Sequence, residues 1–362
     1  MSAGLFPFAI ALLVAAAALL ACALGAPLFA RIRQPRVVAE LCVGILAGFA
    51  LAQGAAAFGL PVLTAQVKGI LYWISEPALL AYMFCLGYAT NLTHLRDGLA
   101  RSSSIAFSRI SVAFTLTFLI LSVNWAWGID PAPSLGGKLA ICGAMSVTAF
   151  PVMARILDEL RMLSSRVGLT ALSAAGVDDA LAWTLLGVLG AIATGSAAGI
   201  DPVLVAFGAG LLTPRLPAIS EPLKQVQQWA TRLMPLFFTL SGMNAVVTGW
   251  VTALPAIALW TAWATVTTAG GSYAAARANR FGKQSSLTIA ALMNCRGVVG
   301  LIFLSVGLRN GLITQHTYAV LLGVALATTF LTTPIVILTA RVRQGAAGGA
   351  AQPASALLAE VS

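Results

Sequence analysis

The sequence predicts an all-α polytopic membrane protein with about 11 transmembrane helices. Its 362 residues are 59% hydrophobic and only 9% charged, with a mean hydropathy of +0.92. Soluble domains carry roughly 25% charged residues, so this chain has too few charges to cover a water-exposed surface. Apolar stretches of about 20 residues, the length that crosses a bilayer, recur along nearly the whole chain. Lys and Arg gather in the short segments between those stretches.

Eleven apolar segments are candidate spans. They comprise residues 5–30, 37–57, 69–91, 103–125, 137–157, 167–194, 201–214, 229–249, 251–276, 285–308 and 314–340. We expect the first to be retained rather than cleaved as a signal peptide, because no basic residue precedes it and Arg31, Arg33 and Arg36 follow it. The seventh is short, so we expect it to begin earlier or to be tilted.

The distribution of basic residues predicts the orientation in the membrane. If the N-terminus lies outside, sixteen of the 21 Lys and Arg residues fall in cytoplasmic loops and three fall outside. This bias predicts a multi-pass protein of the cell (plasma or inner) membrane, embedded in the lipid bilayer, with a cytoplasmic C-terminus. It also explains the net charge of +10 without nucleic acid, since the sequence holds no basic stripe and no motif that reads RNA or DNA.

The cysteines argue against a bound metal. All five lie inside apolar segments and lack the spacing of metal ligands. We therefore expect them to be small buried apolar residues, and we expect no cofactor.

We expect one transmembrane domain over residues 1–344. A first repeat would take up about residues 1–195, and a second, shortened repeat about residues 200–344. Residues 345–362 are small and polar, which predicts a disordered cytoplasmic tail. We expect no soluble domain before or after the membrane part.

The two halves show weak internal similarity. "ELCVGILAGFAL" (40–51) resembles "LVAFGAGLLTPR" (204–215), and "FCLGYATNL" (84–92) resembles "FFTLSGMNAVV" (237–247). Transporters are often built from such repeats, with the binding site at their interface and interrupted helices in matching positions.

Two such interruptions are predicted here, at "SVTAFP" (146–151) and at "NCRG" (294–297). Pro151 lacks an N–H group and crowds the preceding turn, which opens backbone groups near Thr148. Gly297 loosens the second helix, although a single glycine is a weaker signal.

Two adjacent acids, Asp178 and Asp179, interrupt the apolar run "SAAGVDDALAWTLLG" (173–187). One ionised carboxylate near the bilayer centre costs about 2.5–3.5 kcal/mol on insertion scales. A carboxylate shielded from water can hold a proton or a hard cation but not both, and that competition couples the two in an antiporter. Neighbouring residues on a helix point about 100° apart, so one acid can face the substrate path while the other faces a partner.

Residues 146–187, which run from the first interruption through the two acids, resemble the core of the monovalent cation/proton antiporter superfamily. The resemblance is closest to the branch with plant cation/proton exchangers and bacterial Kef-like transporters. "QPRVVAELCVGILAG" (34–48), "LMPLFFTLSGMN" (233–244), "MNCRGVVGLIFLSVGLRNGLI" (293–313) and "TTFLTTP" (328–334) match other family landmarks in the correct order. The resemblance implies an inverted-repeat sodium/proton antiporter fold, in which two broken helices cross at mid-membrane in a core that rocks against a second panel of helices.

The resemblance also implies roles for individual residues. Asp179 would be the main carrier, binding the transported Na⁺ or K⁺ in competition with H⁺. Asp178 would contact a basic residue, and an aspartate in its position is usually associated with electrogenic exchange. Ser146 and Thr148 would supply hydroxyl or carbonyl oxygens, which suit a hard cation.

The chain departs from the family pattern in three places. Thr268 stands where typical members carry a lysine, and Ala89 stands where they carry an acid after the third span. Roughly two spans that follow the aspartate helix in the family are absent. The resemblance implies a homodimer, although one of the absent helices contributes to the family's dimer contact.

Three further charged residues fall inside the predicted spans. Arg296 lies beside the second interruption, where it would neutralise Asp178 or the facing helix ends, or simply fasten the crossing. Glu76 is an intramembrane acid and therefore a candidate for the ion pathway. Arg109 is expected to snorkel to the cytoplasmic face.

The leading hypothesis is a secondary active transporter that exchanges Na⁺ or K⁺ for H⁺ at the aspartate pair, and not an enzyme. One alternative keeps the fold but carries another small solute, such as an organic anion or a metabolite. Another is an intramembrane enzyme that uses paired acids for acid–base chemistry. A fourth is a homologue that has lost transport, which the retained aspartates argue against.

Overall fold

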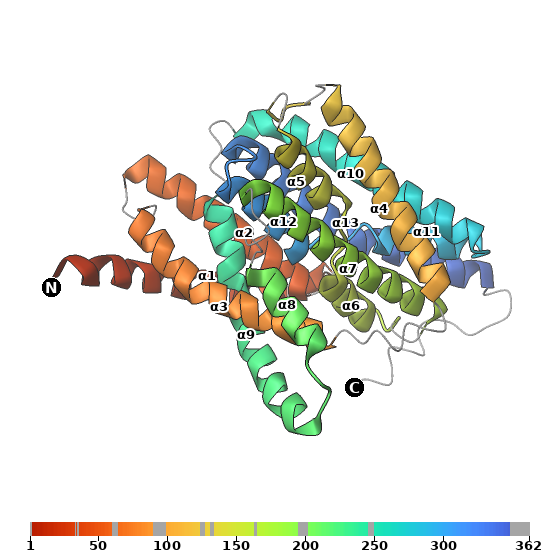
Figure 1. The fold of residues 1–362 in the computed structure, drawn as a ribbon, viewed down its shortest axis with the longest axis horizontal. Coiled ribbons are helices and arrows are strands. Elements are labelled where there is room, and N and C mark those ends of the chain that lie inside the picture. The colour runs from red at the N-terminus through yellow and green to blue at the C-terminus, as the bar shows by residue number, and fades with distance from the viewer. Residues whose placement is uncertain are drawn as a thin grey trace.

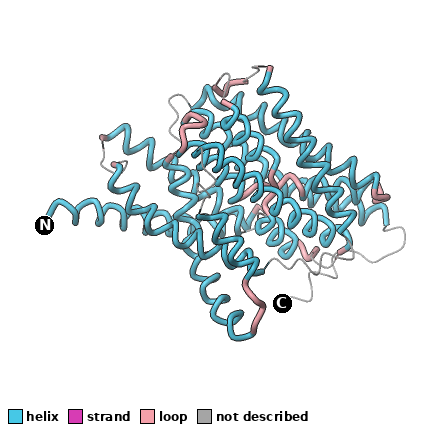
Figure 2. Tube along the Cα trace, viewed as in Figure 1, coloured by secondary structure: helices cyan, strands magenta, loops and turns pink. Residues whose placement is uncertain are grey.

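The computed structural model describes residues 2–32, 34, 36–59, 64–89, 99–123, 127–130, 134–162, 165–194, 202–244 and 250–347. These residues form thirteen helices, and no strand occurs among them (Figures 1 and 2). The helices are α1 (Ser2–Arg31), α2 (Arg36–Phe58), α3 (Ala65–Ala89), α4 (Leu99–Ser122), α5 (Leu135–Ser146), α6 (Phe150–Glu159), α7 (Arg166–Thr194), α8 (Pro202–Leu212), α9 (Pro217–Met243), α10 (Trp250–Ala278), α11 (Lys283–Leu292), α12 (Val298–Arg309) and α13 (Gln315–Ala347). The all-α prediction is confirmed.

Each of the eleven predicted segments contains one helix, except the fifth and the tenth, which each contain two. The fifth is broken between Ser146 and Phe150, and the tenth between Leu292 and Val298. Both breaks lie at the interruptions that the sequence predicts. Pro151 explains the first, because it cannot donate a hydrogen bond to the preceding turn.

Five helices are long and apolar enough to cross a membrane by length and composition, within the part of the chain that the structure describes. The segments are Phe6–Arg31, Val38–Ala55, Ala100–Ser122, Arg166–Gly190 and Gln315–Thr339. The halves of a broken helix are each too short to meet this criterion, and the total of eleven spans stays a prediction.

The helices pack as two bundles, which we call the panel and the core (Figure 1). The panel consists of α1, α2, α3, α8 and α9, which contact one another extensively. The core consists of α4 to α7 and α10 to α13. Only sparse contacts join the two bundles, mainly from α2 to α13 and α6 and from α7 to α8.

Within the panel, α2 and α9 approach each other at glycines. A Cβ atom at Gly48 would lie 1.9 Å from the Thr239 carbonyl oxygen, and a Cβ at Gly242 would lie 2.0 Å from the Ile45 carbonyl oxygen. Such distances leave no room for any side chain. The two backbones therefore touch directly, as small residues allow in membrane helices.

The contact between α3 and α8 has the same construction. A Cβ at Gly87 would lie 2.1 Å from the Phe207 carbonyl oxygen, and a Cβ at Gly210 would lie 2.0 Å from the Phe84 carbonyl oxygen. The panel is thus fastened by two backbone-to-backbone crossings rather than by large interlocking side chains.

The boundary between panel and core is less tightly filled. One cavity, with about 600 Å³ of empty space, is enclosed by α3, α8 and α9 of the panel and by α12 and α13 of the core. A second, of about 580 Å³, is almost wholly apolar and lies between α2 of the panel and α10 and α13 of the core.

The C-terminal helix extends further than the sequence suggests. Residues 345–347, which we expected to begin a disordered tail, form the end of α13. The remainder of the predicted tail, residues 348–362, lies outside the described residues.

Candidate functional site

The candidate site is centred on the two adjacent acids of α7. Asp178 and Asp179 lie near the midpoint of this helix, and only 0% and 4% of their surface is exposed. Because an ionised carboxylate is costly away from water, each must be stabilised by donors from neighbouring elements.

Asp178 is held by donors from two different helices. The guanidinium of Arg109, on α4, pairs with Asp178 Oδ2, and the backbone N–H of Thr148 donates to the same oxygen at 2.6 Å. Arg109 is fully buried. The prediction that Arg109 snorkels to the cytoplasmic face is therefore wrong, because a buried carboxylate offers the guanidinium a partner inside the core.

The break between α5 and α6 explains why N–H groups face the acids. Since Pro151 prevents a continuous helix, α6 starts anew at Phe150, and the N–H groups at its start have no partner within the helix. Thr148 donates to Asp178, and the Phe150 N–H donates to Asp179. The positive end of the α6 dipole also favours negative charge at this point.

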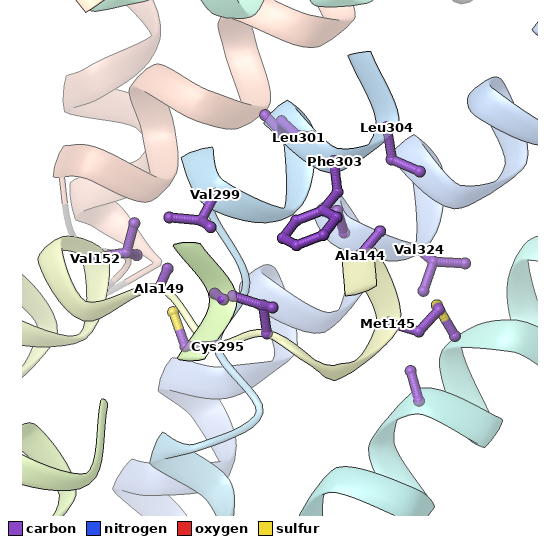
Figure 3. Close-up of a cluster of buried hydrophobic side chains, with 14 of the residues drawn as sticks. Ala144, Met145, Ala149, Val152, Cys295, Val299, Leu301, Phe303, Leu304 and Val324 are labelled. Carbon is purple, nitrogen blue, oxygen red and sulfur yellow. The ribbon is translucent and has the colours of Figure 1, made fainter. Parts of the chain in front are cut away.

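The second break packs directly against the first. Figure 3 shows Ala149 and Cys295 close together where the two unwound segments meet, and the Ala149 N–H donates to the Cys295 carbonyl at 3.0 Å. The Thr148 hydroxyl donates to the Met293 carbonyl at 3.0 Å. A Cβ at Gly297 would lie 2.5 Å from Ala149 Cβ, so a glycine is needed for this approach.

Arg296 fastens the second break to the end of α5. Its Nη1 donates to the Ala144 carbonyl at 2.7 Å, and its backbone N–H and carbonyl both bond to the Thr329 hydroxyl. A cation at the C-terminal end of a helix is favoured by the helix dipole. Arg296 also lies within electrostatic reach of Asp178 and Arg109, and its role toward the acids stays a prediction.

Thr268, which the family resemblance places at the position of a lysine, belongs to an uncharged network. Its hydroxyl lies 2.5 Å from the Ala264 carbonyl and 2.9 Å from Asn294 Oδ1, and Asn294 Nδ2 donates to the Thr265 hydroxyl at 3.2 Å. α10 therefore contributes polar but neutral groups beside the second break.

The charged side chains around the breaks keep several polar atoms without a hydrogen-bond partner. Asp178 Oδ1, Asp179 Oδ1, Arg109 Nε, and Arg296 Nε and Nη2 are all buried and unpartnered. Buried polar atoms are normally satisfied, so these five unpartnered atoms make the surroundings of the two breaks the candidate site. The oxygens are of the kind that hard cations bind.

The two acids face different parts of the molecule, as their adjacent positions predict. Asp178 points toward α4 within the core. Asp179 shares a helix face with Trp183, one turn later, and the Trp183 ring stacks on Phe207 of α8 at a centroid distance of 5.0 Å. Asp179 therefore lies on the side of α7 that faces the panel.

Glu76 lies apart from the aspartate pair, in the cavity between panel and core. The Tyr72 hydroxyl donates to Glu76 Oε1 at 3.1 Å, and Arg309 of α12 bonds to the same hydroxyl. Ser241 and Ser305 also line this cavity. The single carboxylate among these residues faces a space that both bundles enclose.

Of the site residues predicted from the sequence, the structure gathers Asp178, Asp179, Thr148 and Arg296 around the two breaks. Ser146, the last residue of α5, is buried nearby, and its hydroxyl donates to the Gly143 carbonyl of its own helix at 3.4 Å.

Arg109 is the site residue whose role sequence reasoning missed. Its signal was available, because an arginine inside an apolar span is rare and usually has a partner there. What the sequence did not give was the partner, since 69 positions separate Arg109 from Asp178.

Comparison with known proteins identifies relatives for nearly the whole chain. The family described as "Sodium/hydrogen exchanger, transmembrane" matches residues 14–198 and 184–340. Cation/H(+) antiporter 19 of Arabidopsis thaliana is 27% identical over 382 residues, covering 85% of this chain and 46% of the plant protein. Na(+)/H(+) antiporter NhaS4 of Synechocystis sp. is 29% identical over 387 residues, covering 86% of this chain and 92% of that protein. The chain spans about half the length of its plant relative.

The fold is also similar to a solved structure, that of the sodium proton antiporter MjNhaP1 from Methanocaldococcus jannaschii at pH 8. The TM-score is 0.65 at 12% sequence identity, with 92% of this chain and 99% of that chain covered. At this identity the similarity shows the fold alone.

Two features of these matches bear on the expected absence of two spans. The two family matches overlap at residues 184–198, the end of the aspartate helix and the start of the segment that follows it. The alignment to the Synechocystis protein covers 387 residues, more than the 362 of this chain, so that relative has residues inside the aligned region that this chain lacks.

The family matches cover more than half of the chain, and the all-helical fold agrees with them. The chain is therefore a multi-pass integral membrane protein that belongs to the sodium/hydrogen exchanger family of transmembrane transporters.

Proposed function

We propose that this protein exchanges a monovalent cation, Na⁺ or K⁺, for H⁺, and that the two compete at Asp179. The observation that carries this proposal is the buried Asp179 carboxylate, which has one oxygen unpartnered and lies on the panel-facing side of α7. A carboxylate in that position gains from binding either a proton or a hard cation, because each cancels its charge. The function is transport rather than catalysis, and the relatives named as Na⁺/H⁺ and cation/H⁺ antiporters support it.

The residues at the first break assist this exchange. Thr148 orients Asp178 through its backbone N–H, and its hydroxyl oxygen remains able to accept a cation. Ser146 contributes a second hydroxyl oxygen at the end of α5. Together with Asp179 these groups form the oxygen-rich environment that Na⁺ and K⁺ require.

Arg296 and Glu76 support the pathway from two sides. Arg296 holds the second break against α5 and adds positive charge near the acids. Glu76 offers a carboxylate in the cavity at the boundary of panel and core, where a cation can pass between bulk water and the site.

We propose that the core moves against the panel during exchange. Support comes from the sparse contacts and the two cavities between these bundles. The two halves, of about residues 1–195 and 200–344, act as repeats, and the N-terminus lies outside the plasma or inner membrane. Any homodimer forms through the panel helices that this chain retains.

The test is a proton-flux assay with purified protein in liposomes that contain a pH-sensitive dye. Na⁺, K⁺ and Li⁺ are added in turn to wild type, to Asp179→Asn and to Glu221→Gln. Asp179→Asn preserves the shape of the side chain but cannot alternate between charged and protonated forms. Glu221 is an exposed residue of α9 that pairs with Lys224, so its variant controls for loss of an acid far from the site.

We expect cation-dependent proton flux in wild type and Glu221→Gln, and none above the protein-free background in Asp179→Asn. The cation that evokes flux at the lowest concentration identifies the substrate. No flux with any of the three cations in wild type would reject the proposal and favour another solute as cargo. Equal flux in wild type and Asp179→Asn would remove Asp179 from the mechanism.

A further inference from the structure

Among the core residues whose burial the structure describes, four charged side chains are buried, namely Arg109, Asp178, Asp179 and Arg296, and they are not equivalent. Asp178 accepts two hydrogen bonds at one oxygen, from Arg109 and from the Thr148 N–H. Asp179 accepts a backbone hydrogen bond from Phe150 and has no charged partner within salt-bridge distance among the described residues. One acid is therefore paired with a permanent cation, and the other is not.

The packing of α4 against α10 brings Arg109 to this position. The Ser108 hydroxyl donates to the Gly271 carbonyl at 3.1 Å, and a Cβ at Gly271 would lie 3.0 Å from the Arg109 Cα. Because Gly271 has no side chain, α10 approaches the α4 backbone closely at this level. The only charged residue in α10 is Arg277, in its last turn, so α10 offers Asp178 no competing charge.

The guanidinium group makes the pair of Arg109 and Asp178 permanent. An arginine does not release its proton in proteins, unlike a lysine. Separating it from Asp178 would leave two buried charges without partners, which is strongly unfavourable. The pair therefore stays together while ions come and go at the neighbouring acid.

We propose that Arg109 is a positioning residue that keeps Asp178 in a permanent ion pair, so that Asp179 alone carries charge and one cation is exchanged for one proton. The inference rests on the proposed function. It differs from the electrogenic exchange that an aspartate at position 178 suggests by family resemblance. It also assigns to Arg109 a role in fixing the first break, since the same Asp178 oxygen binds the Thr148 N–H.

The first test measures charge movement in the liposomes that show proton flux. Transient currents are recorded from wild-type liposomes adsorbed on a solid-supported membrane, with the transported cation applied at a pH gradient. One-for-one exchange moves no net charge, so we expect proton flux by dye without a cation-dependent current above that of protein-free liposomes.

The outcomes separate this inference from the proposed function. A current that accompanies the flux, with the sign of more than one proton per cation, would overturn the one-for-one exchange and leave the antiporter intact. Absence of flux itself would instead overturn the proposed function.

The second test concerns the role of Arg109. We expect Arg109→Gln to reduce the maximal exchange rate at least about tenfold. We expect Arg109→Lys to keep it within about threefold, because an ammonium can also pair with Asp178, although unlike the guanidinium it can release its proton. Arg101→Gln, an exposed arginine at the start of the same helix, is the matched control and should exchange as wild type does.

A charge transplant distinguishes positioning from simple structural support. Thr268 lies near the first break, because its hydroxyl donates to Asn294. The carbonyl of the preceding residue, Met293, accepts a hydrogen bond from the Thr148 hydroxyl. In the Arg109→Gln background, Thr268→Lys should restore at least about a third of the exchange rate lost. Exchange at the wild-type rate by Arg109→Gln would overturn the assignment. The assignment would also be overturned if Arg109→Gln stays folded and monodisperse but neither Arg109→Lys nor the double variant Arg109→Gln/Thr268→Lys exchanges faster than it does. Should Arg109→Gln not fold, the wild-type current and the Arg109→Lys kinetics still decide the question.

Discussion

The core and the panel solve the problem of packing helices in a membrane in different ways. The core joins its helices through buried polar contacts, and its ion pair links Arg109 of α4 to Asp178 of α7. The panel joins its helices through glycines at which two backbones touch. Among the described residues, the ion pairs of the panel helices, Arg36–Glu40 and Lys224–Glu221, each lie within a single helix, and only Glu40 of these four side chains is buried.

This difference indicates that the two bundles have different functions. The backbone contacts at these glycines leave no room for a side chain between the helices, which suits a bundle that holds its shape. Buried charges and broken helices are costly to maintain, and they concentrate in the bundle that would bind and release ions. The boundary between the two bundles has sparse contacts and contains the two cavities.

The largest effect on stability is expected from breaking the ion pair of the core. Asp178→Ala leaves the Arg109 guanidinium buried without its carboxylate, which should cost about 3–5 kcal/mol of folding free energy. Thermal unfolding in detergent would register this as a strongly lowered transition temperature. The double variant Asp178→Ala/Arg109→Leu removes both charges and should recover most of the loss. A single variant as stable as wild type would mean that the pair does not hold the core.

A smaller loss is expected from filling the glycine crossings of the panel. Gly48→Ala and Gly210→Ala each place a methyl group against a carbonyl oxygen 1.9–2.0 Å away. The helices must separate, at a cost of about 1–3 kcal/mol. Gly54→Ala in α2 and Gly208→Ala in α8 are matched controls, because nothing lies within 4 Å of their Cβ positions, and alanine favours a helix. Equal melting temperatures for both pairs would refute the contact-based account of the panel.

The smallest effect on stability is expected from removing a hydrogen bond at the boundary between core and panel. The Tyr318 hydroxyl of α13 donates to the Ser241 carbonyl of α9 at 3.1 Å, linking core to panel beside the cavity. Tyr318→Phe removes this bond, worth about 0.5–1.5 kcal/mol. We expect a two- to tenfold change in apparent cation affinity, with little change in melting temperature, because the relative position of the bundles shifts while each stays folded. A loss of stability without any change in affinity would place this bond within a rigid unit.

Much of the site could be predicted from the sequence because its signals are local. A proline such as Pro151 kinks or breaks a long helix. Two adjacent acids in an apolar segment cost free energy in the membrane, which indicates a functional role. Both features were therefore visible before the structure. That the two acids point in different directions followed from helix geometry alone.

The partners of these residues could not be predicted. Arg109 was expected to reach the membrane surface because its position inside an apolar span indicated a partner but did not show where along the chain that partner lies. Only the rotation of α4 and its close approach to Gly271 of α10 direct the guanidinium toward Asp178. Likewise, Gly48 and Gly210 look like any other helical glycines until the facing backbone is in place.

The sequence by itself thus determined the helical fold, the two breaks and the acids at the site, because hydropathy, proline geometry and charge act within one segment. The tertiary structure alone decided which cation neutralises which acid, which acid faces the panel and where the bundles leave space. Those outcomes depend on the relative rotation, depth and distance of helices that lie far apart along the chain, and no local pattern encodes them.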